Sequence, residues 1–372
     1  MIERIEFTYH QLPLDPPFPA AWDNRARRNF PVAVVKVFDD SGAMGFGAGD
    51  PMRGLSDYLH LFVGTDPSEL ARHSSVLANI AFHDGRPWPL DTALWDLVGR
   101  LSNRPIWQMV GGRSRQLPAY ASSGIHRSAP EAAEHALSAV ESGFAGLKLR
   151  FGRASLSDDF EVLDAVMSAV PEWFEVMVDC NQGWRMPWYT VEPWTVEYAA
   201  RVADSLAERR VYWMEEPLHR GDHAGMAELR KRTGVRIAGG EMTRELHEFD
   251  LMLDADCLDV YQPDTVTTAG IWELSRLARR IERAGRVFSP HTWGSGVALL
   301  ANAHVTAGTV GTPFLEYPHD PPHWHAAIRD FLLTDPVGID ANGMIDLGDR
   351  PGLGVDLDEE ALAATETGRA QY

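Results

Sequence analysis

The sequence is poor in several features that mark particular classes of protein. It has two cysteines in 372 residues, Cys180 and Cys257, so no disulfide framework supports the fold and a reducing cytoplasm is the expected compartment. No apolar run is long enough to span a membrane, and the first residues, MIERIEF, carry charge where a signal peptide is apolar. Basic residues are scarce, because 34 Lys and Arg face 53 Asp and Glu, a formal net charge of −19. This balance argues against nucleic acid or an anionic membrane as a partner.

A Gly-rich phosphate-binding fingerprint after an early strand is missing as well, which disfavours an open doubly wound sheet. Past residue 115 the chain instead alternates short apolar segments with amphipathic stretches such as PEAAEHALSAVES, in which apolar residues recur at spacings of three and four. The apolar segments end near Tyr120, Lys148, Asp179, Glu215, Gly239, Gln262, Pro290 and Leu315. Eight such βα units close most simply into a parallel barrel of the TIM type, with polar residues of the strand ends at one mouth.

The two ends of the chain differ from this central repeat. Two strand-like segments, IERIEFTYH and PVAVVKVFDD, come before helical stretches around 67–81 and 90–101, an order typical of a separate α+β unit. The segment from Pro336 is rich in turns, and we expect it to fold back onto that unit, with disorder only after Leu362. The predicted fold class is α/β, with an α+β capping domain at 1–115, a barrel at 116–335 and a C-terminal segment at 336–372.

Three carboxylates stand at the ends of consecutive predicted strands. Asp179 in VMVDCN, Glu215 in WMEEP and Glu241 in AGGEM are separated by 36 and 26 residues, about one βα unit each. The strand ends of a parallel barrel meet at one mouth, so the three side chains should converge. Their repulsion at low dielectric would be prohibitive unless a hard cation neutralised them. An all-oxygen ligand set without Cys or His predicts Mg²⁺ rather than Zn²⁺.

Further polar residues share these strand ends. Lys148 and Arg150 alternate along one strand and therefore face the same pocket. Asp264 and His291 lie one βα unit apart, so the carboxylate can fix the imidazole tautomer and make the histidine a general base. Asn181 follows the first predicted metal ligand, and we expect it to contact the substrate.

Taken together, the motifs at these positions resemble those of the enolase superfamily, in its mandelate racemase-like subgroup, over essentially the whole chain. They are LDTALWDLVGR, RPIWQMVGG, GLKLR, VDCNQGW, WMEEPL, GGEM, YQPDTVTTAGIWE, SPHTWGSG, FLEYP and PGLGVDLD. The resemblance implies a capping domain over a (β/α)7β barrel, Mg²⁺ on the three carboxylates, and Asp264 with His291 as the acid/base dyad. It also implies that Glu316 lies on the eighth strand beside the substrate and that the protein forms a homo-oligomer.

Arg150 departs from the subgroup's pattern. Members that use both faces of the substrate have Lys-x-Lys, in which the second Lys is a base, whereas a guanidinium stays protonated and is suited to hold a carboxylate or hydroxyl. We therefore predict one-base chemistry, in which His291 removes the proton beside a carboxylate held by Mg²⁺ and Lys148 and returns it to a neighbouring hydroxyl, which leaves as water. The predicted activity is that of an acid-sugar dehydratase, which converts an aldonate or aldarate to a 2-keto-3-deoxy acid through a metal-stabilised enolate.

Other activities of such a barrel stay open at this point. An epimerase, racemase or cycloisomerase would form the same enolate from its carboxylate substrate and would quench it without loss of water. A barrel without activity, kept as a binding or structural protein, would have no need for Asp264 and His291 to meet. A zinc or iron hydrolase would prefer histidine ligands to three acids.

The cap is expected to complete the substrate pocket. Two of its segments, AWDNRARRNF and DPMRGLSDY, offer as contacts Trp22, Arg25, Arg53 and Tyr58. Their arginines would bring positive charge to an acidic protein and could hold the distal carboxylate of a diacid. Trp184, Trp293 and Tyr317 follow functional positions and would wall the site.

Overall fold

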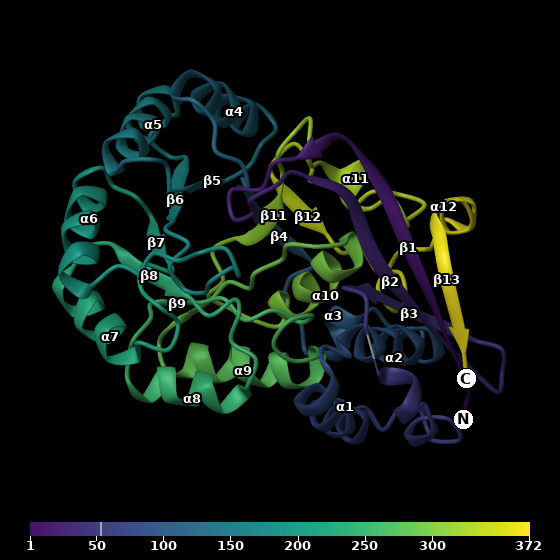
Figure 1. The fold of residues 1–372 in the computed structure, drawn as a ribbon. Coiled ribbons are helices and arrows are strands. Elements are labelled where there is room, and N and C mark those ends of the chain that lie inside the picture. Colours follow the sequence, from purple (N-terminus) through teal and green to yellow (C-terminus); the bar gives the residue numbers. More distant parts are fainter. Residues whose placement is uncertain (53) are drawn as a thin grey trace.

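The computed structural model describes residues 1–52 and 54–372, which form a barrel with a smaller sheet and helices packed against one side (Figure 1). The smaller sheet is antiparallel, in the order β13-β1-β2-β3. Its strands are β1 (Ile2–Phe18), β2 (Arg27–Asp39), β3 (Met44–Gly49) and β13 (Glu366–Gln371). Strands from the two ends of the described chain thus lie side by side, with Phe7 opposite Ala370.

The chain differs from the sequence-based prediction in two places in this part of the fold. The tail after Leu362 is ordered, because α12 (Glu359–Thr365) leads into β13, which pairs with β1. An edge strand with one face in water needs no apolar run, so composition alone hides it. The strand β3 was also missed, since its sequence MGFGAG is rich in glycine and has a single usual β-former, Phe46.

The glycines of β3 have a packing role against the helix α2 (Trp88–Leu101). A Cβ on Gly45 would lie 2.2 Å from Leu97 N, and one on Gly47 would lie 2.0 Å from Pro89 O. Only glycine therefore allows the helix backbone to approach the strand this closely. The remaining helices of this region are η1 (Leu55–Leu61), α1 (Leu70–Asp84) and α3 (Ile106–Met109).

Asp96 on α2 joins three parts of the chain. Its buried carboxylate accepts hydrogen bonds from Phe46 N on β3 at 3.0 Å, from Leu353 N at 2.7 Å and from Arg100 Nε at 2.8 Å. The helix α11 (Ala326–Arg329) precedes the C-terminal segment that supplies Leu353, and this segment contains β12 (Met344–Asp346), which pairs with the barrel strand β4. This segment therefore holds the antiparallel sheet and the barrel together.

The barrel confirms the prediction of eight parallel strands with intervening helices. Its elements are β4 (Gln116–Ser122), α4 (Ala129–Glu141), β5 (Gly146–Arg150), α5 (Leu156–Ala169), β6 (Glu175–Asp179), α6 (Val196–Glu208), β7 (Trp213–Glu215), α7 (His223–Arg232), β8 (Arg236–Gly239), α8 (Leu246–Asp254), β9 (Val260–Tyr261), α9 (Ile271–Arg283), β10 (Val287–Phe288), α10 (Gly296–Thr306) and β11 (Leu315–Pro318). The order is β10-β9-β8-β7-β6-β5-β4-β11, so the last strand pairs with the first. The strand that comes last in the barrel thus lies beside the one that comes first, as the barrel prediction requires.

Side chains packed inside the barrel support the site at its mouth. Buried residues from alternate positions of the strands fill its lower part, and they are Tyr120, Met177, Trp213, Ala238 and Val260. Trp213 and Glu215 share one face of β7 because side chains alternate along a strand. The indole Nε1 of Trp213 donates to Glu215 Oε2 at 3.1 Å, so the packed interior also orients a carboxylate at the mouth. Among the described residues, no helix combines the length and hydropathy that a bilayer span requires.

Candidate active site

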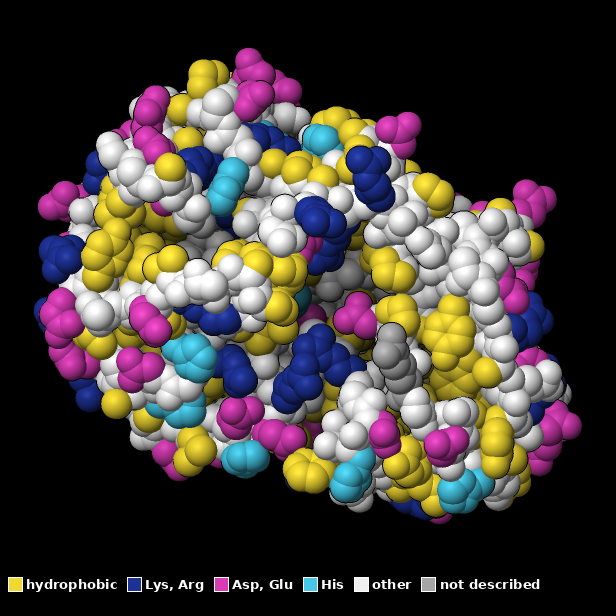
Figure 2. Space-filling model, in the orientation of Figure 1, with side chains coloured by type: hydrophobic (Ala, Val, Ile, Leu, Met, Phe, Trp, Pro, Cys, Tyr) yellow, Lys and Arg dark blue, Asp and Glu magenta, His cyan; other side chains and the backbone are white. Residues whose placement is uncertain are grey.

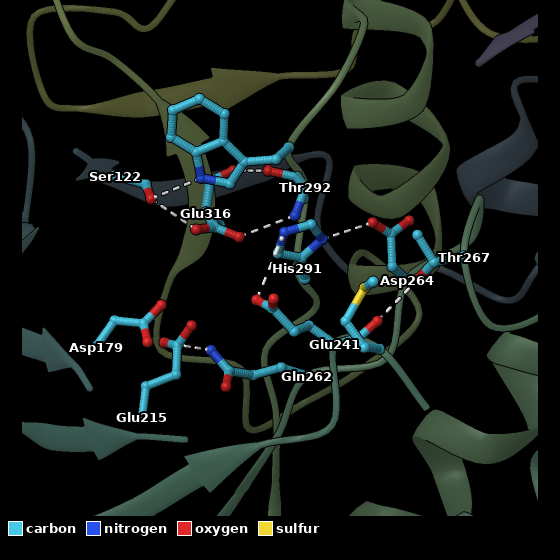
Figure 3. A network of polar contacts seen from close by, with 12 residues as sticks. Ser122, Asp179, Glu215, Glu241, Gln262, Asp264, Thr267, His291, Thr292 and Glu316 are labelled. Carbon is cyan, nitrogen blue, oxygen red and sulfur yellow. Dashed lines mark hydrogen bonds and ion pairs between the residues drawn. The ribbon is translucent and has the colours of Figure 1, made fainter. Parts of the chain in front are cut away.

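Three carboxylates converge at the mouth of the barrel, as the βα spacing predicted (Figure 3). Asp179 ends β6, Glu215 ends β7 and is the register partner of Asp179, and Glu241 follows β8. One ligand oxygen from each lies within 4.8 Å of the others, and all three residues are buried. The geometry thus brings together the trio that the sequence analysis named.

Two structural observations indicate that the trio is suited to bind Mg²⁺. Its donors are all carboxylate oxygens, which is the ligand chemistry of a hard divalent cation. Glu241 Oε2 is buried and has no hydrogen-bond partner among the described residues, while Oε1 accepts from Trp184 Nε1 at 2.6 Å. An orphaned anionic oxygen is costly unless a ligand engages it. Burial, partly offset by the Lys148 ammonium, raises the pKa of Glu215 to about 7, so the protein groups alone do not fully stabilise its charge.

Lys148 lies at the centre of the acidic cluster. It is fully buried on β5, and its Nζ donates to Glu215 Oε1 and lies 2.9 Å from Glu316 Oε1. Burial lowers the pKa of Lys148, but the carboxylates of Glu215 and Glu316 outweigh this effect and hold it above its ordinary value. In this structure Lys148 is therefore an ammonium group at neutral pH, and it balances the negative charge of the carboxylates around it.

Arg150 is fixed two residues further along the same strand. Its Nη1 is ion-paired with Asp179 and donates to Asn181 Oδ1 at 3.1 Å, and its Nε donates to Ser123 O at 2.8 Å. The guanidinium lies over the ring of Trp22, 4.9 Å from its centroid. Asn181 thus contacts Arg150 and has the left-handed φ of 50° that lets the chain turn there, while its contact with substrate stays a prediction.

His291 and Asp264 meet as the sequence predicted. His291 Nδ1 lies 2.8 Å from Asp264 Oδ2, which leaves Nε2 directed toward the trio, 3.6 Å from Glu241 Oε2 (Figure 3). Burial lowers the pKa of His291, but the carboxylates of Glu241 and Asp264 outweigh it and raise the value to about 9. A cation that engages Glu241 would remove part of this effect and bring the imidazole toward the range of a general base.

Four residues that were not predicted to belong to the site hold these groups in place. Asn302 Nδ2 donates to Asp264 Oδ1 at 3.0 Å and to His291 O at 3.0 Å, and Gln262 Nε2 donates to Glu215 Oε2 at 2.7 Å. Asn302 is a lone amide within the apolar helix α10, and Gln262 directly follows β9, two residues before Asp264. Both patterns were available signals for a functional position. The other two, Ser122 and Thr292, carry Glu316.

Glu316 lies on β11 beside Lys148, on the strand and at the position that the sequence implied. Its Oε1 accepts from Ser122 Oγ at 2.7 Å, and its Oε2 accepts from Thr292 N at 2.9 Å. Burial raises the pKa of Glu316, but Lys148 and His291 outweigh this and lower it to about 2. The residue is therefore a carboxylate at neutral pH, and its negative charge keeps Lys148 protonated.

A cavity of about 250 Å³ opens above this group. It is lined by Phe18, Trp22, Arg27, Phe30, Pro31, Asp50, Arg86, Arg150, Trp184, Glu241, Met242, Thr267, His291, Trp293, Gly294 and Trp324. In Figure 2 a hollow lies near the centre of the face, with Lys and Arg side chains on two sides of it. The cavity thus joins residues of the cap to the mouth of the barrel.

The predicted cap contacts divide in the structure. Trp22 lines the cavity, as predicted. Arg25 is exposed and does not line it, whereas Arg27, two residues further on, does. Tyr58 does not line the cavity, and its hydroxyl donates to Asp84 Oδ2 at 2.6 Å within the cap, so its contact with substrate stays a prediction. Arg53 lies outside the described residues. Of the predicted walls, Trp184 and Trp293 line the cavity, while Tyr317 is buried and donates to Val337 O.

The fold and the site define a class of protein: a capped parallel barrel with three carboxylates suited to Mg²⁺ and a His–Asp pair facing them. The family model described as "Enolase C-terminal domain-like" matches residues 131–361. The chain belongs to the enolase superfamily, as its motifs predicted. A structure described as "putative mandelate racemase", from Bordetella bronchiseptica RB50, superposes with a TM-score of 0.86 at 27% identity over 99% of this chain and 98% of that one.

Two curated relatives carry out different reactions on acid sugars. The chain is 28% identical to the D-galactarolactone cycloisomerase of Agrobacterium fabrum over 94% of each chain. It is 29% identical to the arabinonate dehydratase of Saccharolobus solfataricus, over 71% of this chain and 68% of the relative. A racemase structure from Streptomyces coelicolor A3(2) with bound magnesium superposes with a TM-score of 0.84 at 24% identity, over 99% of this chain and 100% of that one, and shows the shared fold.

Proposed function

We propose that this protein catalyses the Mg²⁺-dependent dehydration of an acid sugar, an aldonate or aldarate, to a 2-keto-3-deoxy acid. The observation that carries the proposal is the asymmetry of the site. His291 stands on one side of the carboxylate trio with its Nε2 available, whereas on the other side Arg150 is bound to Asp179 and Asn181. One face of the substrate therefore meets a base, and the other meets a fixed cation.

The charges at the mouth suit a carboxylate substrate. Mg²⁺ on Asp179, Glu215 and Glu241 would supply the positive charge that neutralises the substrate carboxylate and the negative charge that develops on it. The ammonium of Lys148 lies beside the trio and adds a second fixed positive charge. Because Lys148 and Arg150 both stay protonated, neither competes with His291 for the substrate proton.

His291 can perform both proton transfers of the elimination. Its Nε2 takes the proton from the carbon next to the carboxylate, and the electron pair of that C–H bond forms the enolate. The bond from the next carbon to its hydroxyl then breaks, and the imidazolium protonates the departing oxygen, which leaves as water. The enol product tautomerises to the 2-keto-3-deoxy acid, so one substrate yields one keto acid and one water. Asp264 keeps the imidazole in the required orientation and stabilises its charged form.

A cycloisomerase is the second candidate. The same base and enolate would serve when the leaving oxygen belongs to a ring of the substrate and stays attached to the product. The aromatic lining of the cavity favours this alternative, as does the similarity to a cycloisomerase along almost the whole chain. The two reactions differ in whether water is released, so the products separate them.

The test is a screen of mono- and diacid sugars with the Mg²⁺-loaded protein, with 2-keto acid formation and deuterium uptake from D₂O followed in parallel. We expect keto acid from at least one acid, and loss of that activity in His291→Asn. The exposed His247 supplies the matched control His247→Asn, which should keep full turnover. Deuterium exchange without elimination in any acid, or near-normal turnover of His291→Asn, would overturn the proposal.

A further inference from the structure

The turn that follows the barrel strand β4 presents two neighbouring carbonyl groups with different partners. Ser123 O accepts from Arg150 Nε at 2.8 Å, and Gly124 O accepts from Ala21 N of the cap at 2.7 Å. Ala21 directly precedes Trp22, whose ring centroid lies 4.9 Å from Arg150 Cζ. One short turn of the barrel therefore fixes a cation of the site and also the cap segment that brings an aromatic ring over that cation.

Asp320 holds this turn from the loop that follows β11. Its Oδ1 accepts from Ser123 Oγ at 2.9 Å, and its Oδ2 accepts from the backbone N–H of Gly124. The strands β4 and β11 are neighbours in the barrel, with Ser122 opposite Pro318, so the carboxylate reaches the turn from the adjacent strand. Asp320 thus contacts both of the residues that present the two carbonyl groups.

The carboxylate of Asp320 is fully buried, and Arg127 balances its charge. Arg127 Nη1 is ion-paired with Asp320 and also donates to Ser123 Oγ at 3.0 Å. The backbone O of Arg127 accepts from Arg153 Nη2 at 2.8 Å, and Arg153 Nη1 donates to Arg150 O at 2.9 Å. The network therefore reaches Arg150 through its backbone as well as its guanidinium. Charged hydrogen bonds in such a buried network are directional and fix the groups that they join.

Substrate binding does not explain this buried pair. Among the described residues, neither Asp320 nor Arg127 lines the cavity above the trio. A buried ion pair also adds little net stability, because the cost of removing both charges from water offsets their attraction. Its hydrogen bonds do fix geometry, and a displacement of about 1 Å at a catalytic site can cost about 100-fold in rate. The pair is therefore placed to act on the site through the turn.

We infer that Asp320 is a positioning residue, which acts through Ser123 and Gly124 to fix the Arg150 guanidinium and the cap segment that carries Trp22. The inference rests on the proposed function for the part that Arg150 takes in the reaction. Without the Asp320 carboxylate, Ser123 O shifts away from Arg150 Nε, which lowers kcat. The same shift loosens the anchor of the cap segment, which raises KM because Trp22 lines the cavity.

Asp320→Asn keeps the shape of the side chain and removes its charge. One oxygen becomes an NH₂ group that faces donors of Gly124 or Arg127, so the turn must shift. With the Mg²⁺-loaded protein, we expect kcat/KM for the acid found in the screen to fall about 10- to 100-fold, through both a lower kcat and a higher KM. Ser123→Ala removes one contact to Asp320 and keeps the Ser123 carbonyl, so the loss should be about fivefold.

A double-mutant cycle with Arg150→Met separates positioning from stability. In the described part of the chain, Asp320 and Arg150 form neither a hydrogen bond nor an ion pair with each other, so a merely structural role gives additive losses in kcat. Under the inference, Asp320→Asn changes the kcat of Arg150→Met by less than about twofold, because the group that it positions is gone. Additive losses, or a lower Tm with unchanged kcat, would overturn the inference. Ser123→Ala takes the place of Asp320→Asn in the cycle if that variant does not fold.

Hydrogen–deuterium exchange at the peptide that contains Ala21 gives a readout that needs no turnover. The Ala21 amide donates to Gly124 O, so its exchange should be faster in Asp320→Asn than in the parent protein. Unchanged exchange would refute the anchoring even in an active enzyme. Faster exchange in a protein that dehydrates no acid would refute the proposed function and leave the anchoring of the cap segment standing. Asp164, ion-paired with Arg209 on the outside of the barrel, supplies the control Asp164→Asn, with no effect expected on either readout.

Discussion

Arg150 and Asp179 are register partners on the neighbouring strands β5 and β6, and their side chains form an ion pair at the mouth of the barrel. The pairing joins the residue that departs from the subgroup's Lys-x-Lys pattern to a predicted metal ligand. It also explains why the guanidinium cannot simply turn toward a substrate, since Asp179 and the Ser123 carbonyl hold it from two sides.

Arg150→Lys should therefore change the type of chemistry as well as its rate. A lysine is shorter and cannot reproduce both the Ser123 and Asn181 contacts, so we expect dehydration to fall by about tenfold or more. An amine can lose its proton, and deuterium should then enter from the second face of the substrate. NMR in D₂O measures this exchange, and Arg150→Met is the control without a titratable group. If deuterium exchange is equal in Arg150→Lys and Arg150→Met, the arginine at position 150 is not what limits the parent protein to one base.

Asp264→Asn should impair the base without disturbing the metal site. The amide cannot stabilise the imidazolium or enforce its tautomer, so kcat should fall by roughly 10²- to 10⁴-fold. Mg²⁺ binding followed by calorimetry should be nearly unchanged. The surface residue Asp250, ion-paired with Arg280 on α9, provides Asp250→Asn as the control with normal kcat. A loss below tenfold in Asp264→Asn would show that the pair does not act in catalysis.

Metal binding should depend on Glu241, whereas the stability of the metal-free protein should not. Its Oε2 has no partner among the described residues, and an amide oxygen can still accept from Trp184 Nε1, so Glu241→Gln should unfold at about the same temperature in EDTA. Mg²⁺ should raise the Tm of the parent protein by mass action and have little effect on this variant. Glu228→Gln, on the exposed face of α7, should respond as the parent does. An equal Mg²⁺ shift in Glu241→Gln would remove Glu241 from the ligand set.

His304 should make the fold sensitive to mild acid. It is fully buried on α10 and lies 3.2 Å from Leu353 O, and burial lowers its pKa from 6.5 to about 4. The unfolded chain therefore binds this proton at a higher pH than the folded protein does. Its contribution to stability is full above pH 6.5 and is lost as the pH falls toward 4, by up to about 3 kcal/mol.

Urea unfolding at pH 7 and pH 5 measures this loss. His304→Gln should unfold more easily at pH 7 but show a smaller difference between the two pH values than the parent protein. The exposed His60 gives the control His60→Gln, which should keep the parent's pH dependence. A pH difference that is the same in His304→Gln and the parent would show that another group causes the acid sensitivity.

Gly124→Ala should directly disturb the aromatic rings that wall the cavity. The new methyl group would lie 2.8 to 2.9 Å from Trp293, Phe18 and Trp22, so the rings must move apart. Overpacking of this kind costs about 1–3 kcal/mol of stability. We also expect lower kcat/KM, measured with the acid found in the screen. Gly338→Ala is the matched control, since a Cβ there meets no atom within 4 Å. A fully stable and active Gly124→Ala would show that these rings adapt without cost.

The barrel and the trio were predictable because both follow from repeats along the chain. Alternation within a strand and the βα period fix which residues stand at strand ends, and that was enough for Asp179, Glu215 and Glu241 and for the pairing of Asp264 with His291. The homo-oligomer and the cytoplasmic compartment, which rest on other grounds, stay predictions.

The cap was harder to predict because no period governs its loops. Arg25 and Arg27 are two residues apart on an irregular segment, and only the docking of cap on barrel decides that Arg27 lines the cavity. The amide of Asn181 turns to Arg150 because the neighbouring strand presents a guanidinium there, a contact between side chains that no single segment encodes. The strand β3 was missed for a related reason, because its glycines are required by the close approach of helix α2, a contact distant in sequence.

The pairing of β13 with β1 also bears on how such proteins diversify. The cap is not a contiguous stretch of sequence, because strands that precede and follow the barrel complete one sheet. A single genetic crossover between two related genes would give a cap with mismatched halves and an exposed edge on β1. New specificities are therefore easier to reach by point changes in loops such as the one that carries Trp22 than by exchange of whole caps, and engineered chimaeras of this chain would need two junctions placed together.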